Sequence, residues 1–363
     1  MIIKNIKIEN FKNIEKIELS PCEKVNVIFG KNAQGKTNIL EAIWLFSGAK
    51  SFRTLKEQEF IKISAPFFKN EILFDDGERE NNIKFVLGEK KEITFNGVSG
   101  KNSSFLAGKF MTVIFVPAHL SFVSGGPEIR RRFLDGIICQ IKPSYIKLLH
   151  KYHKILFQRN TLLKNIYTNA DLYDILDVWD SELSECGFLI INERIKFLEE
   201  LSKIASEFYR GISGGKEEMK AVYISSFNDI LTKEKFSEAL KKGRADDIRN
   251  GFTNIGPHRD DIDITIDSLS AKKYSSQGQQ RSIILTLKLA EGELIKIKSG
   301  KKPIFLLDDV MSELDEERQD FILNHVKDNQ VFITCCDVSS VLRLFSGKIF
   351  EIENGKIINE KNK

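Results

Sequence analysis

The feature that most constrains this chain is a glycine-bearing loop at residues 30–37. An apolar run at 25–29 precedes the loop and a helical pattern at 38–46 follows it. That context confirms a phosphate-binding loop of the G-x-x-x-x-G-K-[ST] type, whose backbone N–H groups face phosphate oxygens at a helix N-terminus. The residues expected to bind the phosphates are Gly30, Lys31, Asn32, Ala33, Gln34, Gly35, Lys36, Thr37 and Asn38.

Two side chains of this loop are expected to act on the nucleotide directly. Lys36 would reach the β- and γ-phosphates, and the hydroxyl of Thr37 would bind Mg²⁺. A glycine loop can arise by chance, but the strand and helix patterns around this one argue against that explanation. The sequence therefore predicts an α/β protein that binds ATP and Mg²⁺.

A second signal lies near the C-terminus, where four apolar residues at 304–307 are followed by Asp308 and Asp309. A buried strand delivers such carboxylates to its C-terminal end, where the ligands of open α/β sheets bind. Asp308 would hold the Mg²⁺ shell, and Asp309 would orient the water that attacks the γ-phosphate. An apolar strand ending in two acids is common, so this catalytic assignment depends on its pairing with the loop at 30–37.

A third signal is a segment rich in serine, glycine and glutamine at 274–281, which precedes a leucine-rich helical pattern. A helix that opens with serines and a glycine is another phosphate-binding device. Since the first loop already binds one nucleotide, we expect Ser276, Gly278 and Gln279 to contact a second nucleotide on a partner subunit. Taken alone, the segment is explained as well by an N-cap followed by a core helix.

The hydrophobic pattern divides the chain into two α/β ends and a helical middle. In the N-terminal end, alternation over 71–96 predicts an antiparallel β meander. In the C-terminal end, the expected elements are a strand at 303–307, a helix at 316–326, a strand at 331–334 and a closing hairpin at 349–358.

Between these ends, glycine and proline become scarce. Two helices of about 25 to 30 residues, one over 145–167 and one that includes 198–208, would form an antiparallel arm. We therefore expect one head domain made from residues 1–127 and 251–363, with a helical arm domain of residues 128–250 inserted into it.

Composition sets weaker limits on function. The net charge is only +4 and the pI is near 8.6, which permits nucleic-acid binding without requiring it. The five cysteines include no CxxC pair, so reduced thiols in a cytoplasmic protein are expected. No uncharged apolar run approaches the ~20 residues that span a bilayer, and no membrane association is expected.

Contact with DNA phosphates requires exposed cations and little else. The densest basic run is at 130–132, and lysines recur at 147, 151, 154 and 164. A solvated helical face explains the lysines equally well, and carboxylate bridges between arm and head explain the arginines equally well. The candidates for DNA contact are Arg130, Arg131, Arg132, Lys151 and Lys154.

The order of the three signals resembles an ABC-type ATPase head, and the whole chain resembles the RecF family of bacterial DNA replication and repair proteins. The resemblance implies an α/β fold, with a phosphate-binding loop, a mixed sheet, an antiparallel β meander and an inserted α-helical arm domain. The matching pieces run in family order through residues 8–12, 30–38, 130–135, 256–261, 275–281 and 307–315.

The same resemblance implies a function. It suggests an ATP-dependent homodimer that binds double-stranded or gapped DNA and assists recombinase loading with RecO and RecR. Ser276 and Gly278 of one subunit would cap the ATP bound by Lys36 of the other, and Asp315 would lie in the loop that crosses between subunits. Weak, DNA-dependent hydrolysis would release the dimer. ABC transporters typically carry glutamate where Asp309 stands, and the shorter carboxylate is expected to slow turnover.

Three other classes of protein fit the sequence less well. A transporter ATPase subunit does not need the long helical insertion, and a structural DNA-organising protein of the SMC type needs far longer heptad regions. A small-molecule kinase leaves the segment at 275–280 without a purpose. The family usually carries threonine where Cys335 and Cys336 follow Thr334, so a phosphate-sensing role for that strand is not expected here.

Overall fold

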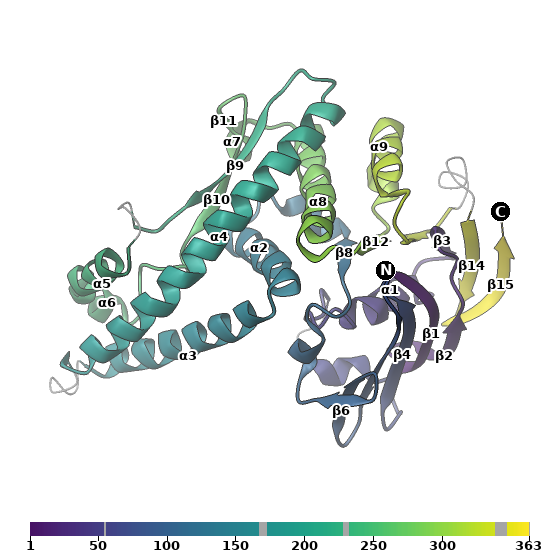
Figure 1. The fold of residues 1–363 in the computed structure, drawn as a ribbon, viewed down its shortest axis with the longest axis horizontal. Helices are drawn as coiled ribbons and strands as arrows, with labels where there is room; N and C mark the ends of the chain where they lie inside the picture. The colour runs from purple at the N-terminus through teal and green to yellow at the C-terminus, as the bar shows by residue number, and fades with distance from the viewer. Residues whose placement is uncertain (54–55, 167–172, 228–231, 338–346, 363) are drawn as a thin grey trace. The chain divides into compact units, whose positions relative to one another are not determined.

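The computed structural model describes residues 1–53, 56–166, 173–227, 232–337 and 347–362 (Figure 1). The chain forms two compact units. The head unit comprises Met1–Ser121, Ile204–Glu217 and Ser276–Lys363. The arm unit comprises Phe122–Lys203 and Glu218–Ser275.

These units differ from the boundaries expected at 127/128 and 250/251. Residues 251–275 belong to the arm unit because strand β10 (Asp261–Ile266) pairs with strand β9 (Met219–Ile224), which the helical interpretation of the middle did not include. Residues 204–217 belong to the head unit, where Gly211 lies so close to the ring of Phe321 that a Cβ would approach it to 3.1 Å. Hydrophobic spacing is a local signal, and it does not report pairing between distant segments.

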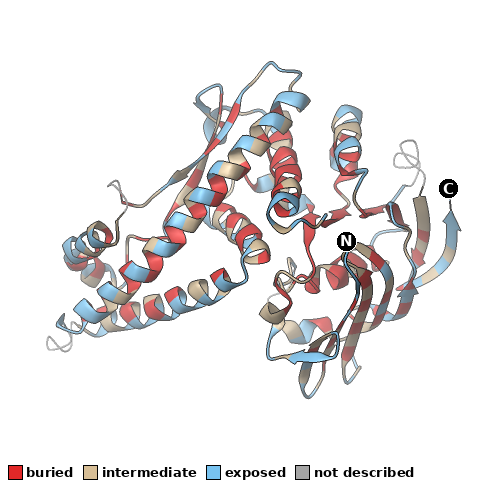
Figure 2. Ribbon diagram, viewed as in Figure 1, coloured by how far each residue is buried: buried red, intermediate tan, exposed pale blue. Residues whose placement is uncertain are grey.

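The first layer of the head unit is a six-stranded mixed sheet in the order β15-β14-β3-β13-β12-β8. Its pairs are parallel except β14 with β15. The central strands are buried along their whole length, as expected for a parallel sheet covered on both faces (Figure 2). The strands are β3 (Val25–Phe29), β8 (Thr112–Phe115), β12 (Ile304–Asp308), β13 (Val331–Cys335), β14 (Gly347–Glu353) and β15 (Lys356–Asn362).

The second sheet is antiparallel, in the order β2-β1-β4-β5-β6-β7, which confirms the predicted meander. Every second residue of β4 is buried, so one face forms a core and the other is polar. The rings of Phe11, Phe68 and Phe85 pack edge to face in that core. The strands are β1 (Ile2–Phe11), β2 (Ile14–Leu19), β4 (Phe68–Asp75), β5 (Glu80–Leu87), β6 (Lys91–Phe95) and β7 (Val98–Gly100).

Three longer helices belong wholly to the head unit: α1 (Lys36–Leu45), α8 (Gln277–Ser299) and α9 (Glu316–Val326). Helix α1 contacts β12 and β13, and α8 contacts β8 and α9. Helix α9 has the bounds expected from the sequence, with Asp315 as its N-cap accepting from the N–H of Arg318. Across the described residues, no helix combines the length and apolar character needed to cross a membrane.

The arm unit combines helices with a small antiparallel sheet of β9, β10 and β11 (Leu269–Ser270). The two expected arm helices are α3 (Ser144–Asn165) and α4 (Leu176–Ile212), with 22 and 37 residues rather than similar lengths. Residue 167, the expected end of the first, lies outside the described residues. The other helices are α2 (Pro127–Ile141), α5 (Lys233–Lys242), α6 (Arg244–Asn250) and α7 (Ala271–Tyr274).

A buried arginine ties the arm helices together. Arg159 on α3 is fully buried and donates to Asp180 of α4 and Asp247 of α6, each over 2.7 Å. It also donates to the hydroxyl of Thr253 over 2.8 Å. Buried charges of this kind need full pairing, so removing one partner is expected to destabilise the arm.

Candidate nucleotide-binding site

The predicted phosphate loop lies between β3 and α1. Gly30 and Gly35 have φ values of 153° and 107°, and Ala33 has 64°, so the loop uses backbone conformations that favour glycine. A Cβ at Gly30 would lie 2.3 Å from the carbonyl O of Ile352. Glycine is therefore required at position 30 by close approach of β14 as well as by φ.

Lys36 is 4% exposed and folds back over the loop. Its Nζ donates to the carbonyl O of Gly30 over 2.6 Å and to that of Lys31 over 3.1 Å. It also lies 3.4 Å from Sγ of Cys336, whose thiol donates to Oδ1 of Asn32 over 2.9 Å. The ammonium group is thus held inside the loop, where a phosphate would meet it.

The two signals from opposite ends of the sequence meet at one carboxylate oxygen. The hydroxyls of Thr37 and Thr334 each donate to Oδ1 of Asp308 over 2.8 Å. Burial raises the pKa of Asp308, while these two hydrogen bonds act in the opposite direction. The parallel register of β12 and β13, which sets Asp308 beside Thr334, produces this geometry.

These groups fit a magnesium ion. A hydroxyl and a carboxylate are oxygen ligands of the kind that Mg²⁺ prefers, and Mg²⁺ usually takes only one or two protein ligands besides phosphates and waters. Within the described residues there is no cluster of three or more His, Cys, Asp or Glu side chains that would form an all-protein cage. Thr37 and Asp308 are the residues that would hold Mg²⁺ here.

Asp309 has an unusual backbone conformation. Its φ is 50°, in the left-handed region, and its N–H donates to the hydroxyl of Thr334 over 2.9 Å. Asp and Asn adopt this region more readily than other non-glycine residues do. The chain therefore leaves the regular strand conformation at Asp309, one residue after β12 ends.

Two residues outside the predicted set, Asn13 and Arg53, support the loop, and neither was predicted from the sequence. Asn13 accepts from Nδ2 of Asn38 over 2.7 Å and donates to the carbonyl O of Ala33 over 3.2 Å. Arg53 donates to Oδ1 of Asn38 over 2.8 Å. Gln34 accepts from the N–H of Asn354 in the hairpin turn. No local motif marks Asn13 or Arg53, because each contacts the loop from a segment distant in sequence.

The segment at 275–281 forms the N-terminus of α8. Ser276 is the N-cap, and it forms a reciprocal capping box with Gln279. Nε2 of Gln279 also donates to Glu217 over 2.8 Å. The carbonyl O of Gly278 accepts from Arg318, the residue that also pairs with Asp315.

The structure brings only part of the predicted site together within one chain. The phosphate loop meets Asp308 through Thr37, and Asp309 follows Asp308 at the end of β12. Among the described residues, no hydrogen bond joins the segment at 275–281 to that loop, and the side chain of Ser276 faces solvent. One chain therefore presents a phosphate loop and, separately, an exposed helix N-terminus.

The three consecutive arginines of α2 have three different environments, because successive residues of a helix point about 100° apart. Arg130 is 2% exposed and makes a bidentate ion pair with Asp261, over 2.6 and 2.9 Å. This corrects its assignment as a DNA contact, since its donors are taken up inside the arm. Arg132 is exposed and pairs with Glu128, whereas Arg131 is half-buried and donates to the carbonyl O of Asp260.

The two lysines proposed for DNA contact both lie on the exposed side of α3. Lys151 pairs with Glu182 over 3.0 Å. Lys154 is exposed and forms no ion pair with any of the described residues. Of these two, Lys154 is the cation more available to an external phosphate.

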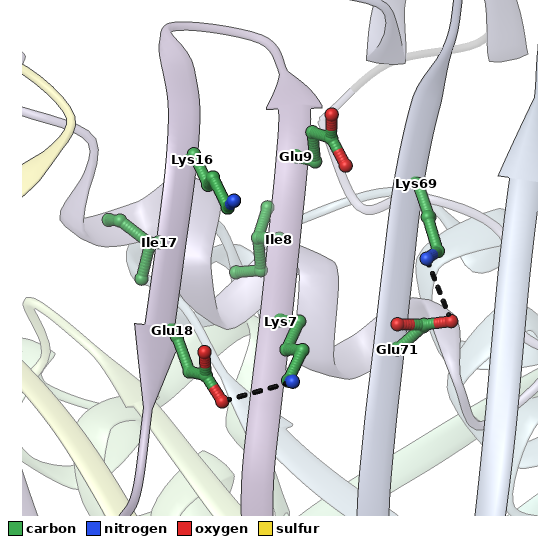
Figure 3. A pocket seen from close by; sticks show the side chains of 8 residues that line it. All are labelled: Lys7, Ile8, Glu9, Lys16, Ile17, Glu18, Lys69 and Glu71. Atoms are coloured by element: carbon green, nitrogen blue, oxygen red, sulfur yellow. Dashed lines mark ion pairs between the residues drawn. The ribbon is translucent and has the colours of Figure 1, made fainter.

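A shallow pocket on the polar face of β1, β2 and β4 is lined by charged residues whose charges balance (Figure 3). Lysines and glutamates alternate along it, and two ion pairs, Lys7 with Glu18 and Lys69 with Glu71, cross or line it. The pocket holds three lysines and three glutamates. It carries no net charge, and nothing in it favours a charged ligand.

Known proteins resemble this chain in sequence over nearly its whole length. Residues 2–346 match the family described as the RecF/RecN/SMC N terminal domain. Proteins described as DNA replication and repair protein RecF from Agathobacter rectalis and Ruminiclostridium cellulolyticum are 39% and 40% identical to this chain. Each alignment covers 98% of this chain and 99% of the relative.

Solved structures share the fold. One, described as the recombination mediator protein RecF-ATPrS in the RecFOR pathway, has a TM-score of 0.91 at 37% identity and covers 98% of this chain and 97% of its own. An SMC head bound to the C-winged helix domain of ScpA has a TM-score of 0.56 at 16% identity, covering 100% and 98%, and shares the fold alone. The predicted ABC-type head fold is confirmed.

Proposed function

Because this chain belongs to the RecF family of DNA replication and repair proteins, we propose that it binds ATP with Mg²⁺ and that ATP joins two copies of it on DNA. The observation that carries the proposal is the meeting of Thr37 and Asp308 beside the buried ammonium of Lys36. This set is what nucleoside triphosphate binding requires: donors for phosphate and oxygen ligands for the metal. The RecF-ATP structure, with a TM-score of 0.90 at 37% identity, supports the choice of ATP.

In this proposal each residue has one role. The N–H groups of the loop and the Lys36 ammonium bind the β- and γ-phosphates, after Lys36 leaves its contacts with the carbonyls of Gly30 and Lys31. Mg²⁺, when bound, neutralises charge on the phosphate oxygens. Asp309 orients the water that attacks the γ-phosphorus, and its short side chain makes hydrolysis slow.

The proposed dimer is based on the exposed N-terminus of α8, which, in the described part of the chain, does not contact the phosphate loop. Ser276 is exposed at the N-terminus of a 23-residue helix, α8, and is positioned by its capping box with Gln279. Such a helix end favours negative charge. The γ-phosphate bound to one subunit is the anion we assign to Ser276 and Gly278 of the other, so that two nucleotides lie between two copies.

Binding to double-stranded or gapped DNA and cooperation with RecO and RecR are proposed from the relatives. One solved relative is described as a recombination mediator in the RecFOR pathway, and the proposal carries that role to this chain. ATP-bound dimers would hold DNA, and weak, DNA-dependent hydrolysis would release it. The dimer would thus act as a timer for recombinase loading.

The test is the mass of the protein in solution, by light scattering, with and without ATP and Mg²⁺. We expect ATP to double the mass of the wild type. Lys36→Met should fail to bind ATP, whereas Ser276→Arg should bind ATP and remain a monomer, because the long side chain blocks the partner's phosphate. If ATP binds and the wild type stays monomeric, the dimer is wrong and a single-subunit P-loop enzyme becomes the better explanation.

A further inference from the structure

The arm unit contains a cavity of about 370 Å³ that the proposed ATP site does not use. It lies among helices α2, α3 and α4 and the residues that lead into β10. Its charged lining consists of three arginines, two histidines and two carboxylates, namely Arg131, Arg132, Arg194, His153, His258, Glu128 and Asp135.

The two carboxylates of this cavity are already paired. Asp135 accepts two hydrogen bonds from Arg194, over 2.9 and 2.8 Å, and a third from the hydroxyl of Tyr145 over 2.8 Å. Glu128 pairs with Arg132, one turn along the exposed face of α2. Two of the three guanidinium groups are thereby neutralised.

Arg131 is the guanidinium left over. Within the described part of the chain it forms no ion pair, and its one hydrogen bond runs from Nη1 to the carbonyl O of Asp260 over 2.6 Å. Burial, followed by repulsion from Arg194, lowers the pKa of Arg131. The carboxylates near Arg131 are those of Asp261, Glu128 and Asp260, and each is engaged by another partner. A half-buried cation that only shares its counter-charges is costly, and an anion in the cavity would relieve that cost.

Hydrogen bonds between protein groups hold the wall around Arg131 in the absence of a ligand. Asp260, whose carbonyl holds Arg131, accepts from the hydroxyl of Tyr223 and from the N–H of Ser226, each over 2.6 Å. The hydroxyl of Tyr152 lies 2.7 Å from Nδ1 of His258, and Nε2 of His258 lies 3.0 Å from the carbonyl O of Thr253. A rigid wall lets a ligand bind without a further cost in ordering.

The surface beside the cavity is also positively charged. Leu149, Tyr152 and His153 of α3 line it, and the 22 residues of α3 include no Asp or Glu. Lys147 and Lys154 are exposed on this helix. The contrast with the balanced pocket of Figure 3 is direct, since that pocket has a carboxylate for every lysine.

We propose that this cavity binds a phosphate group, with Arg131 as its main ligand. Two sources share that chemistry: a backbone phosphate of duplex DNA and a free phosphate compound such as pyrophosphate. The DNA source rests on the proposed function, whereas the free source does not. The guanidinium fork has donors beyond Nη1 for the phosphate oxygens.

The experiment compares Arg131→Gln with Arg249→Gln in the full-length protein. Arg249 is an exposed arginine of the same unit, paired with Asp246 three residues away, and it lies outside the cavity lining. Binding of a labelled DNA duplex is measured by fluorescence anisotropy with ATP and Mg²⁺, over a series of salt concentrations. Binding of pyrophosphate is measured calorimetrically in a Lys36→Ala background, which removes the phosphate loop as a competitor.

For a DNA phosphate, Arg131→Gln weakens duplex binding about tenfold and lowers the salt dependence by about one phosphate contact, while Arg249→Gln changes neither. For a free phosphate, Arg131→Gln abolishes pyrophosphate binding and leaves duplex binding unchanged. The proposal is overturned if both affinities survive. If the wild type binds no duplex at all, the proposed DNA function fails, and the pyrophosphate measurement alone decides on the cavity.

The variant Arg131→Lys tests whether a loss of binding in Arg131→Gln is due to a folding defect. It keeps the charge but loses the planar fork, so we expect intermediate affinity with an unchanged melting temperature. The assignment is overturned if Arg131→Gln is folded and both Arg131→Gln and Arg131→Lys bind with full wild-type affinity.

Discussion

The hydroxyl of Thr37 donates a hydrogen bond to Oδ1 of Asp308 over 2.8 Å, although the two residues are 271 positions apart. The same oxygen accepts from Thr334. Two hydroxyls thus contact one carboxylate, but only that of Thr37 belongs to the phosphate loop. This difference gives a matched pair of substitutions.

We expect Thr37→Val to lower Mg²⁺-dependent ATP binding and to reduce hydrolysis about 100-fold or more, because it removes a metal ligand while keeping the volume of the side chain. Thr334→Val should bind Mg²⁺–ATP nearly as well as the wild type and lose about tenfold in hydrolysis, because Thr334 only orients Asp308 and Asp309. Nucleotide titrations with Mg²⁺ and with EDTA, followed by phosphate release, measure both. Equal effects of the two substitutions would show that Thr37 only orients Asp308.

Alkylation of Cys336 should block ATP binding. Its exposed thiol lies 3.4 Å from Nζ of Lys36 and 2.9 Å from Oδ1 of Asn32, so any added group would occupy the phosphate loop. N-ethylmaleimide should abolish ATP binding in the wild type, ATP should protect it, and Cys336→Thr should resist the reagent. Cys139→Ser is the control and should remain sensitive, because burial raises the pKa of Cys139 to about 12 and keeps that thiol unreactive.

Arg130 and Arg132 should differ in their effect on stability. Arg130→Ala breaks a buried bidentate pair with Asp261 and is expected to cost about 3 kcal/mol. Arg132→Ala removes an exposed i,i+4 pair with Glu128 and should cost about 0.5 kcal/mol or less. Urea unfolding of the two variants measures the difference. Equal losses would contradict the burial of Arg130.

These arginines illustrate the limits of sequence reasoning. The phosphate loop, the acidic strand and α9 were predictable because each is specified by residues adjacent in sequence. The contacts of Arg130, Asn13 and Glu217 with Asp261, Asn38 and Gln279 join segments that are distant in sequence. Strand β9 likewise pairs with β10, which lies some forty residues later. The arginines at 130, 131 and 132 are identical in sequence, but they form a buried ion pair, a half-buried cation and a surface ion pair, respectively.

Stability should fall as the pH is lowered from 7 to about 5. Burial lowers the pKa of His258 from 6.5 to about 4, so the folded state binds fewer protons than the unfolded state between these values. The stabilisation by neutral His258 is therefore complete above pH 6.5 and is lost as the pH falls toward 4. We expect about 1 to 2 kcal/mol between pH 7 and pH 5 from this residue.

His258→Gln is the matched control for that prediction. A glutamine amide offers one acceptor to the hydroxyl of Tyr152 and one donor to the carbonyl O of Thr253, as neutral histidine does, but it does not titrate. Urea unfolding at both pH values should show a flatter pH dependence in the variant. An unchanged slope would remove His258 as the cause.

Glu217 should position the helix end assigned to the partner's nucleotide. Its carboxylate accepts from Nε2 of Gln279 over 2.8 Å and from the hydroxyl of Tyr209 over 2.7 Å. Gln279 completes the capping box that orients Ser276. Because Glu217 acts through Gln279 and touches no residue of the phosphate loop, Glu217→Ala should leave the ATP affinity of the monomer within about twofold of the wild type.

The same substitution should weaken ATP-driven dimerisation about tenfold, since a freed Gln279 leaves the N-terminus of α8 less ordered. Sedimentation equilibrium with ATP and Mg²⁺ measures the dimer, and a nucleotide titration of dilute protein measures the affinity of the monomer. Glu217→Gln keeps an acceptor oxygen for Gln279 and should restore most of the loss. If Glu217→Ala weakens ATP binding as strongly as dimerisation, Glu217 supports the head fold as a whole and has no separate role at the N-terminus of α8.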